Sequence, residues 1–204
     1  MFKLKTFMAL AMATMALASC TQNASNEATE QTAEPALADT LSKVKPQELK
    51  NAIELISDDW MLLAAGTKED FNEMTISWGA MGELWGKDVI TVFVDTTRYT
   101  YQYMVREDYF TVTGFPKKYH EDLQYLGTHS GRDGNKLAET DLHAAFTELG
   151  TPYFEEASVV IECKKIYANN FDTSKMTNGF EDFYAKRGSV HAVFIGEIVN
   201  TWKK

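Results

Sequence analysis

Polar residues and glycines alternate with apolar residues in the segment NEMTISWGAMGELWGK, which covers residues 72–87. Its first half has the period of a strand that packs one face on a core and turns the other toward a cavity. Backbone groups and short hydroxyls on such a strand can approach a flat heterocyclic ring closely. Gly79 and Gly82 remove side chains that would obstruct the ring, so we expect the strand to run into a glycine-rich turn. The residues expected to face the ring are Asn72, Met74, Thr75, Ser77 and Trp78.

Two later segments carry hydroxyl and cationic side chains of the kind that bind a phosphate. Arg98 and Thr100 lie near the expected start of a helix, where side-chain donors, free backbone N–H groups and the helix dipole act on one anion. The flexible, glycine-rich stretch GTHSGRDGNK adds Ser130, Arg132 and Lys136. Taken alone, this stretch also fits a solvated surface turn. The order and spacing of all three segments favour a site for a planar molecule that carries a phosphate.

The elements that must position these residues are mostly short strands. Strands are expected over 60–65, 74–78, 89–94, 109–115, 157–167 and 191–202. Helices are expected over 96–104, where N-cap residues precede aromatics at helical spacing, and over 120–126. The segment 41–56 is interpreted as a short helix or an extended lead-in, and 171–188 as a loop that can form a lid.

This pattern favours a mainly β fold with short helices, an antiparallel barrel, over a doubly wound parallel sheet, because strands and helices do not alternate regularly. At 204 residues, one domain accounts for most of the chain. Tyr99 and Tyr103 would share one helix face, for which packing in the core is favoured over stacking on a ligand.

The N-terminal segment has the features of a bacterial lipoprotein signal. Lys3 and Lys5 precede an apolar run over 7–18 that is too short to span a membrane as a helix. The run ends in LASC, so Cys20 is expected to become the lipidated first residue of the mature chain. Ordinary signal cleavage beside an incidental cysteine is the alternative.

The polar, acidic sequence after Cys20 is typical of a flexible spacer. The expected division of the chain is a lipoprotein signal peptide over 1–19, a flexible tether over 20–40 and a single domain over 41–204. The protein is therefore expected to be exported and held at the membrane of the cell envelope by its lipid anchor.

Composition argues against several other classes of function. The chain has 20 basic and 29 acidic residues, a balance that disfavours nucleic acid as a partner. The histidines at 120, 129, 143 and 191 lack the spacing of metal ligands, so no metal is expected, and no G-x-S-x-G motif of a serine hydrolase is present. Cys163 lies in an apolar run and is interpreted as a small buried hydrophobic residue with no role in redox chemistry.

The motifs N-x-M-T-x-S-W-G, W-G-K before a strand, R-Y-T-Y at the start of a helix and S-G-R-D-x-x-K resemble, in this order, those of the flavin reductase-like family that includes flavoredoxins. The similarity extends from about Leu55 to the end and includes YFEEA at 153–157 and IGEIV at 195–199. It implies a split antiparallel β-barrel that binds FMN, as a homodimer with the flavin near the subunit interface.

Carried over by motif, the resemblance implies two groups of ligand-binding residues. The isoalloxazine ring and ribityl chain would be lined by Asn72, Met74, Thr75, Ser77 and Trp78. The phosphate would be surrounded by Arg98, Thr100, Ser130, Arg132 and Lys136. His191 falls where a C-terminal strand could face the ring, and a half-buried histidine on a strand edge is an equal alternative.

The function implied is electron transfer by an FMN-dependent oxidoreductase in which no side chain acts as a catalytic acid or base. A lipoprotein that binds flavin or another planar ligand without turnover is the alternative, and a structural dimer with an eroded site is disfavoured by the three cations. Export departs from the many cytosolic members that take hydride from a nicotinamide, which leaves the electron donor and acceptor open.

Overall fold

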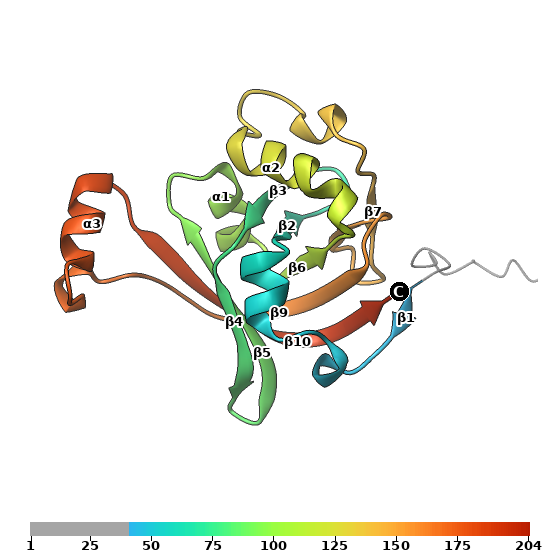
Figure 1. The fold of residues 1–204 in the computed structure, drawn as a ribbon, viewed down its shortest axis with the longest axis horizontal. Helices are drawn as coiled ribbons and strands as arrows, with labels where there is room; N and C mark the ends of the chain where they lie inside the picture. Colours follow the sequence, from blue (N-terminus) through green and yellow to red (C-terminus); the bar gives the residue numbers. More distant parts are fainter. Residues whose placement is uncertain (1–40) are drawn as a thin grey trace, which may run out of the picture. The chain divides into compact units, whose positions relative to one another are not determined.

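The structure, a computed structural model, describes residues 41–204 (Figure 1). The expected signal peptide and the whole of the expected tether, which includes Cys20, lie outside the described residues. The strands are β1 (Ser42–Lys43), β2 (Met61–Gly66), β3 (Phe71–Ile76), β4 (Gly79–Leu84), β5 (Lys87–Asp95), β6 (Tyr109–Gly114), β7 (Ala144–Phe146), β8 (Pro152–Phe154), β9 (Val159–Asn170) and β10 (His191–Lys203). The helices are η1 (Pro46–Glu48), η2 (Ile53–Asp58), α1 (Tyr99–Arg106), η3 (Lys117–Tyr119), α2 (His120–Thr128), η4 (Lys136–Glu139), η5 (Thr173–Lys175) and α3 (Phe180–Arg187). No helix within these residues is long and apolar enough to cross a membrane.

One antiparallel sheet dominates the fold. Its strands lie in the order β3-β2-β6-β9-β10-β5-β4, and β1 pairs with β10 outside this path. The two longest strands, β9 and β10, pair along most of their length in the middle of the sheet. β7 and β8 form a separate pair. Every pairing is antiparallel, so the predicted mainly β class with short helices is confirmed.

Both faces of β2 are buried, which explains its continuous apolar sequence. Leu63 and Ala65 point into the main core with residues of β5, β6, β9, β10 and α1. Leu62 and Ala64 point the other way, into a second core beneath α2. Tyr103 of α1 is buried in the main core, so the interpretation of this tyrosine as a packing residue is confirmed.

A close contact in the middle of the sheet depends on a glycine of β10. The register of β10 against β9 shifts between Ile195 and Gly196. A Cβ atom at Gly196 would lie 2.5 Å from Cζ of Phe110 and 2.7 Å from Cβ of Cys163. Cys163 itself is fully buried, as predicted, and burial raises the pKa of its thiol. Only a residue without a side chain fits at this position.

The expected glycine-rich turn is wrong, because the residues concerned form β4. The turn comes later, at Trp85 and Gly86, whose φ angles of 56° and 73° suit a tight hairpin between β4 and β5. Gly79 serves packing instead: a Cβ atom there would lie 2.8 Å from the carbonyl oxygen of Thr91 and 2.9 Å from Cδ1 of Ile56. Gly79 is therefore needed where β4 approaches β5 closely. Because glycine is also the residue typical of turns, the sequence alone does not separate the two cases.

The prediction of a loop over 171–188 is also wrong, because this segment contains η5 and α3. Figure 1 shows α3 to one side of the sheet, joined to it by the ends of β9 and β10. The helix lies between two left-handed glycines, Gly179 and Gly188, with φ angles of 84° and 73°. Acidic residues in its first turn and basic residues in its last turn complement the helix dipole. The lead-in over 41–56 contains an extended segment, β1, together with short helical turns.

We expect Gly196→Ala to lower the free energy of unfolding by about 1–3 kcal/mol, because the added methyl group must displace Phe110 or Cys163. Gly82→Ala is the matched control in a strand, since no heavy atom lies within 4 Å of the position of its Cβ atom. The control should change stability by no more than about 0.5 kcal/mol. Urea unfolding followed by tryptophan fluorescence measures both, and equal effects would contradict the packing argument.

Candidate functional site

Every residue predicted to bind the ligand lines one or both of two adjoining cavities. The larger has a volume of about 430 Å³, the smaller of about 170 Å³. The predicted residues of the larger cavity are Asn72, Met74, Arg98, Thr100, Ser130, Arg132 and Lys136. Those of the smaller cavity are Met74, Thr75, Ser77, Trp78, Arg98 and His191. The two cavities share Met74, Asp95, Arg98 and Arg187, and therefore form one groove.

Three arginines line the larger cavity, and two of them, from separate segments, were predicted to bind the ligand. Arg98, the N-cap residue of α1, donates from Nη1 to the carbonyl oxygen of Gly127 at 3.1 Å. Arg132 donates from Nη1 to the carbonyl oxygen of Thr97 at 3.0 Å, and its guanidinium lies 5.1 Å from the ring centroid of Tyr99. A guanidinium has five N–H donors, so both side chains keep donors for an anion in the cavity.

The loop between α2 and η4 packs directly on β3 and α1. A Cβ atom at Gly131 would lie 2.1 Å from Oδ1 of Asn72 and 2.8 Å from Cδ1 of Tyr99. Next to it, the backbone N–H of Arg132 donates to Oγ of Ser130 at 3.2 Å. The start of the loop is therefore placed by its contacts with β3 and α1, while residues 132–135 are exposed, as in the solvated surface turn that the sequence also fits.

Asn72 and Thr100 are buried and join β3 to α1. Nδ2 of Asn72 donates to Oγ1 of Thr100 at 2.7 Å and to the carbonyl oxygen of Glu73 at 3.0 Å. Oγ1 of Thr100 lies 3.3 Å from the same carbonyl oxygen. Both side chains line the cavity while they hold its walls together, and their contact with a ligand stays a prediction.

Lys136 is buried, which differs from the expected cation in a flexible loop. Its ammonium donates to the carbonyl oxygens of Glu73 at 2.7 Å and Leu126 at 2.8 Å, and lies 3.9 Å from the carboxylate of Glu73. Burial lowers the pKa of Lys136 and raises the pKa of Glu73, and the attraction between the two charges opposes both changes. Lys136 thus ties β3 to the last turn of α2.

An exposed tryptophan and a buried histidine line the smaller cavity. The ring of Trp78, which is 52% exposed, lies 5.1 Å from the ring of His191. Nδ1 of His191 is 3.0 Å from the hydroxyl of Tyr184. Burial lowers the pKa of His191, the charge of Asp95 opposes this shift, and the net direction favours the neutral ring. His191 is buried in β10, within the sheet, and does not match the half-buried edge residue of the alternative.

Thr75 and Ser77 complete the predicted residues of the smaller cavity. The hydroxyl of Thr75 donates to the carbonyl oxygen of Leu123 in α2, so this side chain also fixes the helix against β3. Ser77 follows the end of β3 and is half-buried. Within residues 41–204, no cluster of three or more His, Cys, Asp or Glu side chains is placed to hold a metal ion.

A buried carboxylate at the junction of the two cavities escaped the sequence analysis. Asp95, at the end of β5, accepts hydrogen bonds from the backbone N–H and hydroxyl of Thr97, at 2.9 and 2.7 Å. It also accepts from Nε of Arg187 at 2.6 Å and from the hydroxyl of Ser189 at 2.7 Å. The sequence D-T-T carries the local part of this signal, an Asp beside a hydroxyl two residues later. The bonds to Arg187 and Ser189 have no signal in the sequence.

We expect Asp95→Asn to lower the free energy of unfolding at pH 7 by about 1–3 kcal/mol, because several donors lose a charged acceptor. Burial alone would raise the pKa of Asp95, but hydrogen bonds from Thr97, Arg187 and Ser189 outweigh it and hold the pKa well below its ordinary value of 3.8. The contribution is therefore full above pH 3.8 and is lost as the pH falls through the lower pKa of the folded state.

Urea unfolding of the wild type and of Asp95→Asn between pH 7 and pH 2.5 measures this loss. The difference between their free energies of unfolding should become smaller as the pH falls. Asp88→Asn is the control, since its carboxylate accepts an exposed hydrogen bond from Gln47. A difference between wild type and Asp95→Asn that is constant over this range would show that the charge of Asp95 does not matter.

We expect Lys136→Met to lower the free energy of unfolding by about 3–5 kcal/mol, because the carboxylate of Glu73 is left buried beside two carbonyl oxygens that have lost a donor. The control is Lys87→Met, which removes a solvent-exposed pair with Glu197 and should cost at most about 1 kcal/mol. Adding Glu73→Gln to Lys136→Met should recover part of the loss in a double-mutant cycle. No coupling between the two sites would contradict the pairing.

The model of the flavin reductase like domain matches residues 56–204, more than half of this chain. A comparison of this chain with curated proteins found no match. Among solved structures, an FMN-binding domain of a flavin reductase-like enzyme from Shewanella baltica is 17% identical, with a TM-score of 0.58, over 80% of this chain and 76% of that one. Flavoredoxin from Methanosarcina acetivorans is 18% identical, with a TM-score of 0.56, over 72% of this chain and 68% of that one.

A third similar structure is a putative flavin reductase with a split barrel domain from Shewanella frigidimarina. It is 12% identical, with a TM-score of 0.58, over 72% of this chain and 67% of that one. At such identities the similarity concerns the fold, which is the split antiparallel β-barrel predicted from the motifs. The match over residues 56–204 and the shared fold give one conclusion: this chain belongs to the family of flavin reductase-like domains.

Proposed function

We propose that this protein binds FMN and transfers electrons as a flavoprotein of the flavin reductase-like family. The observation that carries the proposal is the single groove in which a cavity lined by arginines adjoins a cavity lined by the rings of Trp78 and His191. Its family and the FMN-binding domain from Shewanella baltica, which has a similar fold, support the same ligand.

The larger cavity suits the phosphate of FMN. Arg98 and Arg132 reach it from separate segments, and the first turn of α1 adds the positive end of a helix dipole. The hydroxyl of Ser130 supplies a further donor. Lys136 contributes positive charge from within the wall, and two of its three N–H groups already donate to backbone carbonyls. We assign the two arginines the main part in holding the phosphate, because a charge-assisted hydrogen bond from an accessible guanidinium needs no rearrangement.

The smaller cavity suits the ring of the flavin. β3 ends the order of strands and pairs with β2 on one side, so backbone groups along its other edge are not used within the sheet. Residues 74–78 continue along this edge into the cavity. Trp78 and His191 stand beside it with their rings 5.1 Å apart. A neutral His191 can donate or accept one hydrogen bond there without adding charge.

Bound FMN would supply the electron transfer itself, so no side chain of this chain has to act as an acid or a base. The groove residues position the ring, keep water from one side of it and set the electrostatic potential around it. The arginines and Lys136 outnumber Asp95 among the charged residues of the groove, so this surrounding has a positive balance toward the phosphate end, to which neutral His191 adds no charge.

We further propose that the protein is a lipoprotein of the cell envelope, anchored by Cys20, and that it forms a homodimer. The basic residues, the apolar run and the LASC sequence at the N-terminus support the first proposal, and the family resemblance supports the second. Outside the cytoplasm a nicotinamide donor is not expected, so a small molecule or another protein is the expected source of electrons.

The second candidate function is a binding module that holds flavin without turnover. Photoreduced protein loaded with FMN, mixed with ferricyanide or with oxygen, separates the two functions. A carrier of electrons should be reoxidised by one acceptor much faster than by the other, whereas a pure binding protein should be reoxidised slowly by both. Protein that stays colourless after incubation with FMN would overturn both functions.

We expect Arg98→Ala and Arg132→Ala each to weaken FMN binding by roughly 10- to 100-fold, the loss of a charge-assisted hydrogen bond to the phosphate. Binding of riboflavin, which lacks the phosphate, should change less than about threefold. Quenching of flavin fluorescence on titration measures both ligands, and FAD in the same assay tests whether a longer phosphate-linked group is accepted.

Arg106→Ala is the matched control, because Arg106 lies on the same helix as part of an exposed ion pair with Asp70, away from both cavities. It should leave the affinity for FMN unchanged. An equal loss of FMN and riboflavin binding in the Arg98 and Arg132 variants would show that these side chains do not contact the phosphate.

A further inference from the structure

A third cavity, of about 610 Å³, lies between α3 and the sheet. Its walls are mostly aromatic, and these residues are Trp78, Phe93, Phe171, Phe180, Phe183 and Tyr184. The remaining lining residues are Lys175, Met176, Thr177 and Asn178. The volume falls within the range of pockets that bind small organic molecules, about 300–1,000 Å³.

This aromatic cavity continues the groove proposed to hold the flavin ring. Trp78 and Phe93 line both the aromatic cavity and the smaller cavity of the groove. The rings of Trp78 and Tyr184 lie 5.1 Å and 5.7 Å from the ring of His191 between them. A molecule in the aromatic cavity would therefore lie next to the ring end of the flavin groove, where electrons can be exchanged over a short distance.

The outer wall of this cavity is held in place by several bonds. The hydroxyl of Tyr184 bonds to His191, and Arg187 at the end of α3 pairs with Asp95. At the other end of the segment, the backbone N–H of Phe171 donates to the carbonyl oxygen of His191 at 2.9 Å. These bonds fix α3 relative to β5 and β10, so the space behind it is a defined part of the fold.

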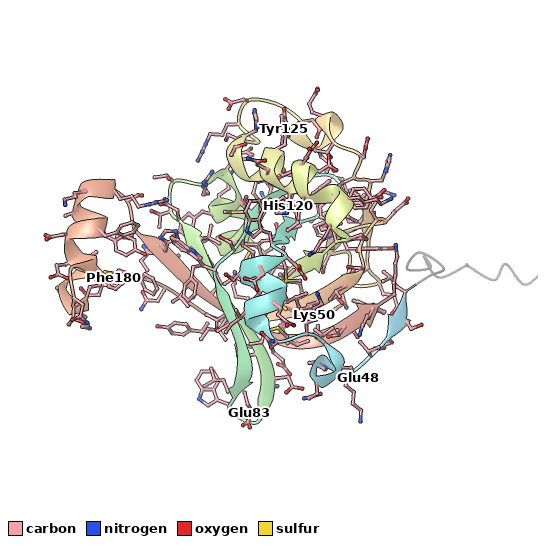
Figure 2. All side chains as sticks on the ribbon, viewed as in Figure 1. Glu48, Lys50, Glu83, His120, Tyr125 and Phe180 are labelled. Carbon is pink, nitrogen blue, oxygen red and sulfur yellow. The ribbon has the colours of Figure 1, made fainter. Side chains whose placement is uncertain are left out.

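The aromatic side chains at the mouth are left partly in solvent, although they are large and apolar. Phe180, labelled in Figure 2 on α3, is 61% exposed, and Phe183 is 43% exposed. Exposed apolar groups gathered at one cavity mark a binding surface. A single exposed side chain elsewhere, such as Trp85, needs no such explanation.

The chemistry of the walls defines the ligand. Aromatic rings bind a flat conjugated molecule through stacked and edge contacts. None of the described lining residues is acidic, which disfavours a cation. Asn178 and Thr177 can donate to carbonyl oxygens. Lys175 adds one positive charge, and its ammonium also forms an ion pair with the carboxylate of Asp172 at 3.3 Å. These features fit an uncharged or anionic aromatic compound with carbonyl groups.

We propose that the aromatic cavity binds a quinone as the electron acceptor, an inference that rests on the proposed function for its redox step. The quinone takes up two electrons and one proton from the anionic form of reduced flavin, and a second proton from solvent. It leaves as the hydroquinone, and the flavin is left oxidised.

The test uses menadione, a naphthoquinone, as the probe on the full-length protein with and without FMN. Isothermal titration calorimetry measures its binding directly. Phe183→Ala and Phe180→Ala should each weaken menadione binding by roughly 3- to 10-fold, the contribution of an aromatic contact, and leave the affinity for FMN unchanged. Trp85→Ala, which removes an aromatic side chain that is 71% exposed and lies outside the cavity, is the control and should change neither affinity. Cyclohexanone, a carbonyl compound without an aromatic ring, should bind more weakly than menadione.

Protein that binds FMN but not menadione, or that binds menadione equally well in all variants, would overturn the inference and leave the proposed function standing. Protein that binds menadione with the expected loss in the variants, but does not bind FMN, would support the aromatic site and overturn the proposed function. The alternative occupant of this face is a second copy of the chain, which sedimentation velocity tests. If Phe180→Ala and Phe183→Ala turn a dimer into monomers and menadione does not bind, the face is an interface between copies and the inference is overturned.

Discussion

The arrangement of the groove depends on the carboxylate of Asp95. A buried charge is stable only when it is fully paired, and this one is paired by donors from two separate parts of the chain. Thr97 fixes the backbone just before α1, which places Arg98 in the wall that the two cavities share. Arg187 and Ser189 bring the end of α3 to the same point. One acceptor thus sets the start of a helix, the place of the aromatic wall and the junction of the cavities.

The sheet could be predicted from the sequence where burial leaves a simple pattern. The strands β2 and β10 were expected nearly as they are found, because both faces of β2 are buried and its sequence is continuously apolar. β4 was missed, because Gly79 was interpreted as part of a turn although the residue is needed for the close approach to Thr91. α3 was missed because it has only 8 residues and lies between two glycines, which also fit a loop. Phe180, Phe183 and Tyr184 do have helical spacing, but Tyr184 is the one buried residue among them.

The site residues that could be predicted are those that local sequence spacing indicates. Arg98 and Arg132 were found because hydroxyls and glycines surround them in the sequence, and the fold brings both to one cavity. The pairing of Asp95 with Arg187 joins residues 92 positions apart, and a single sequence holds no record of such a contact. The sequence shows that Lys136 is a cation, but its burial beside Glu73 follows from the packing of α2 on β3. Residue types can be read locally, whereas partners come from the fold.

The position of Cys163 gives the protein a built-in reporter of its own opening. The thiol is sealed behind Phe110 and the backbone of Gly196, where β9 and β10 meet. Among residues 41–204 it is the free cysteine, and its raised pKa keeps it protonated and unreactive while the strands stay paired. A thiol-modifying reagent reaches Cys163 only when β9 and β10 separate. The rate of modification therefore measures how often this part of the sheet opens, without a label attached to the chain.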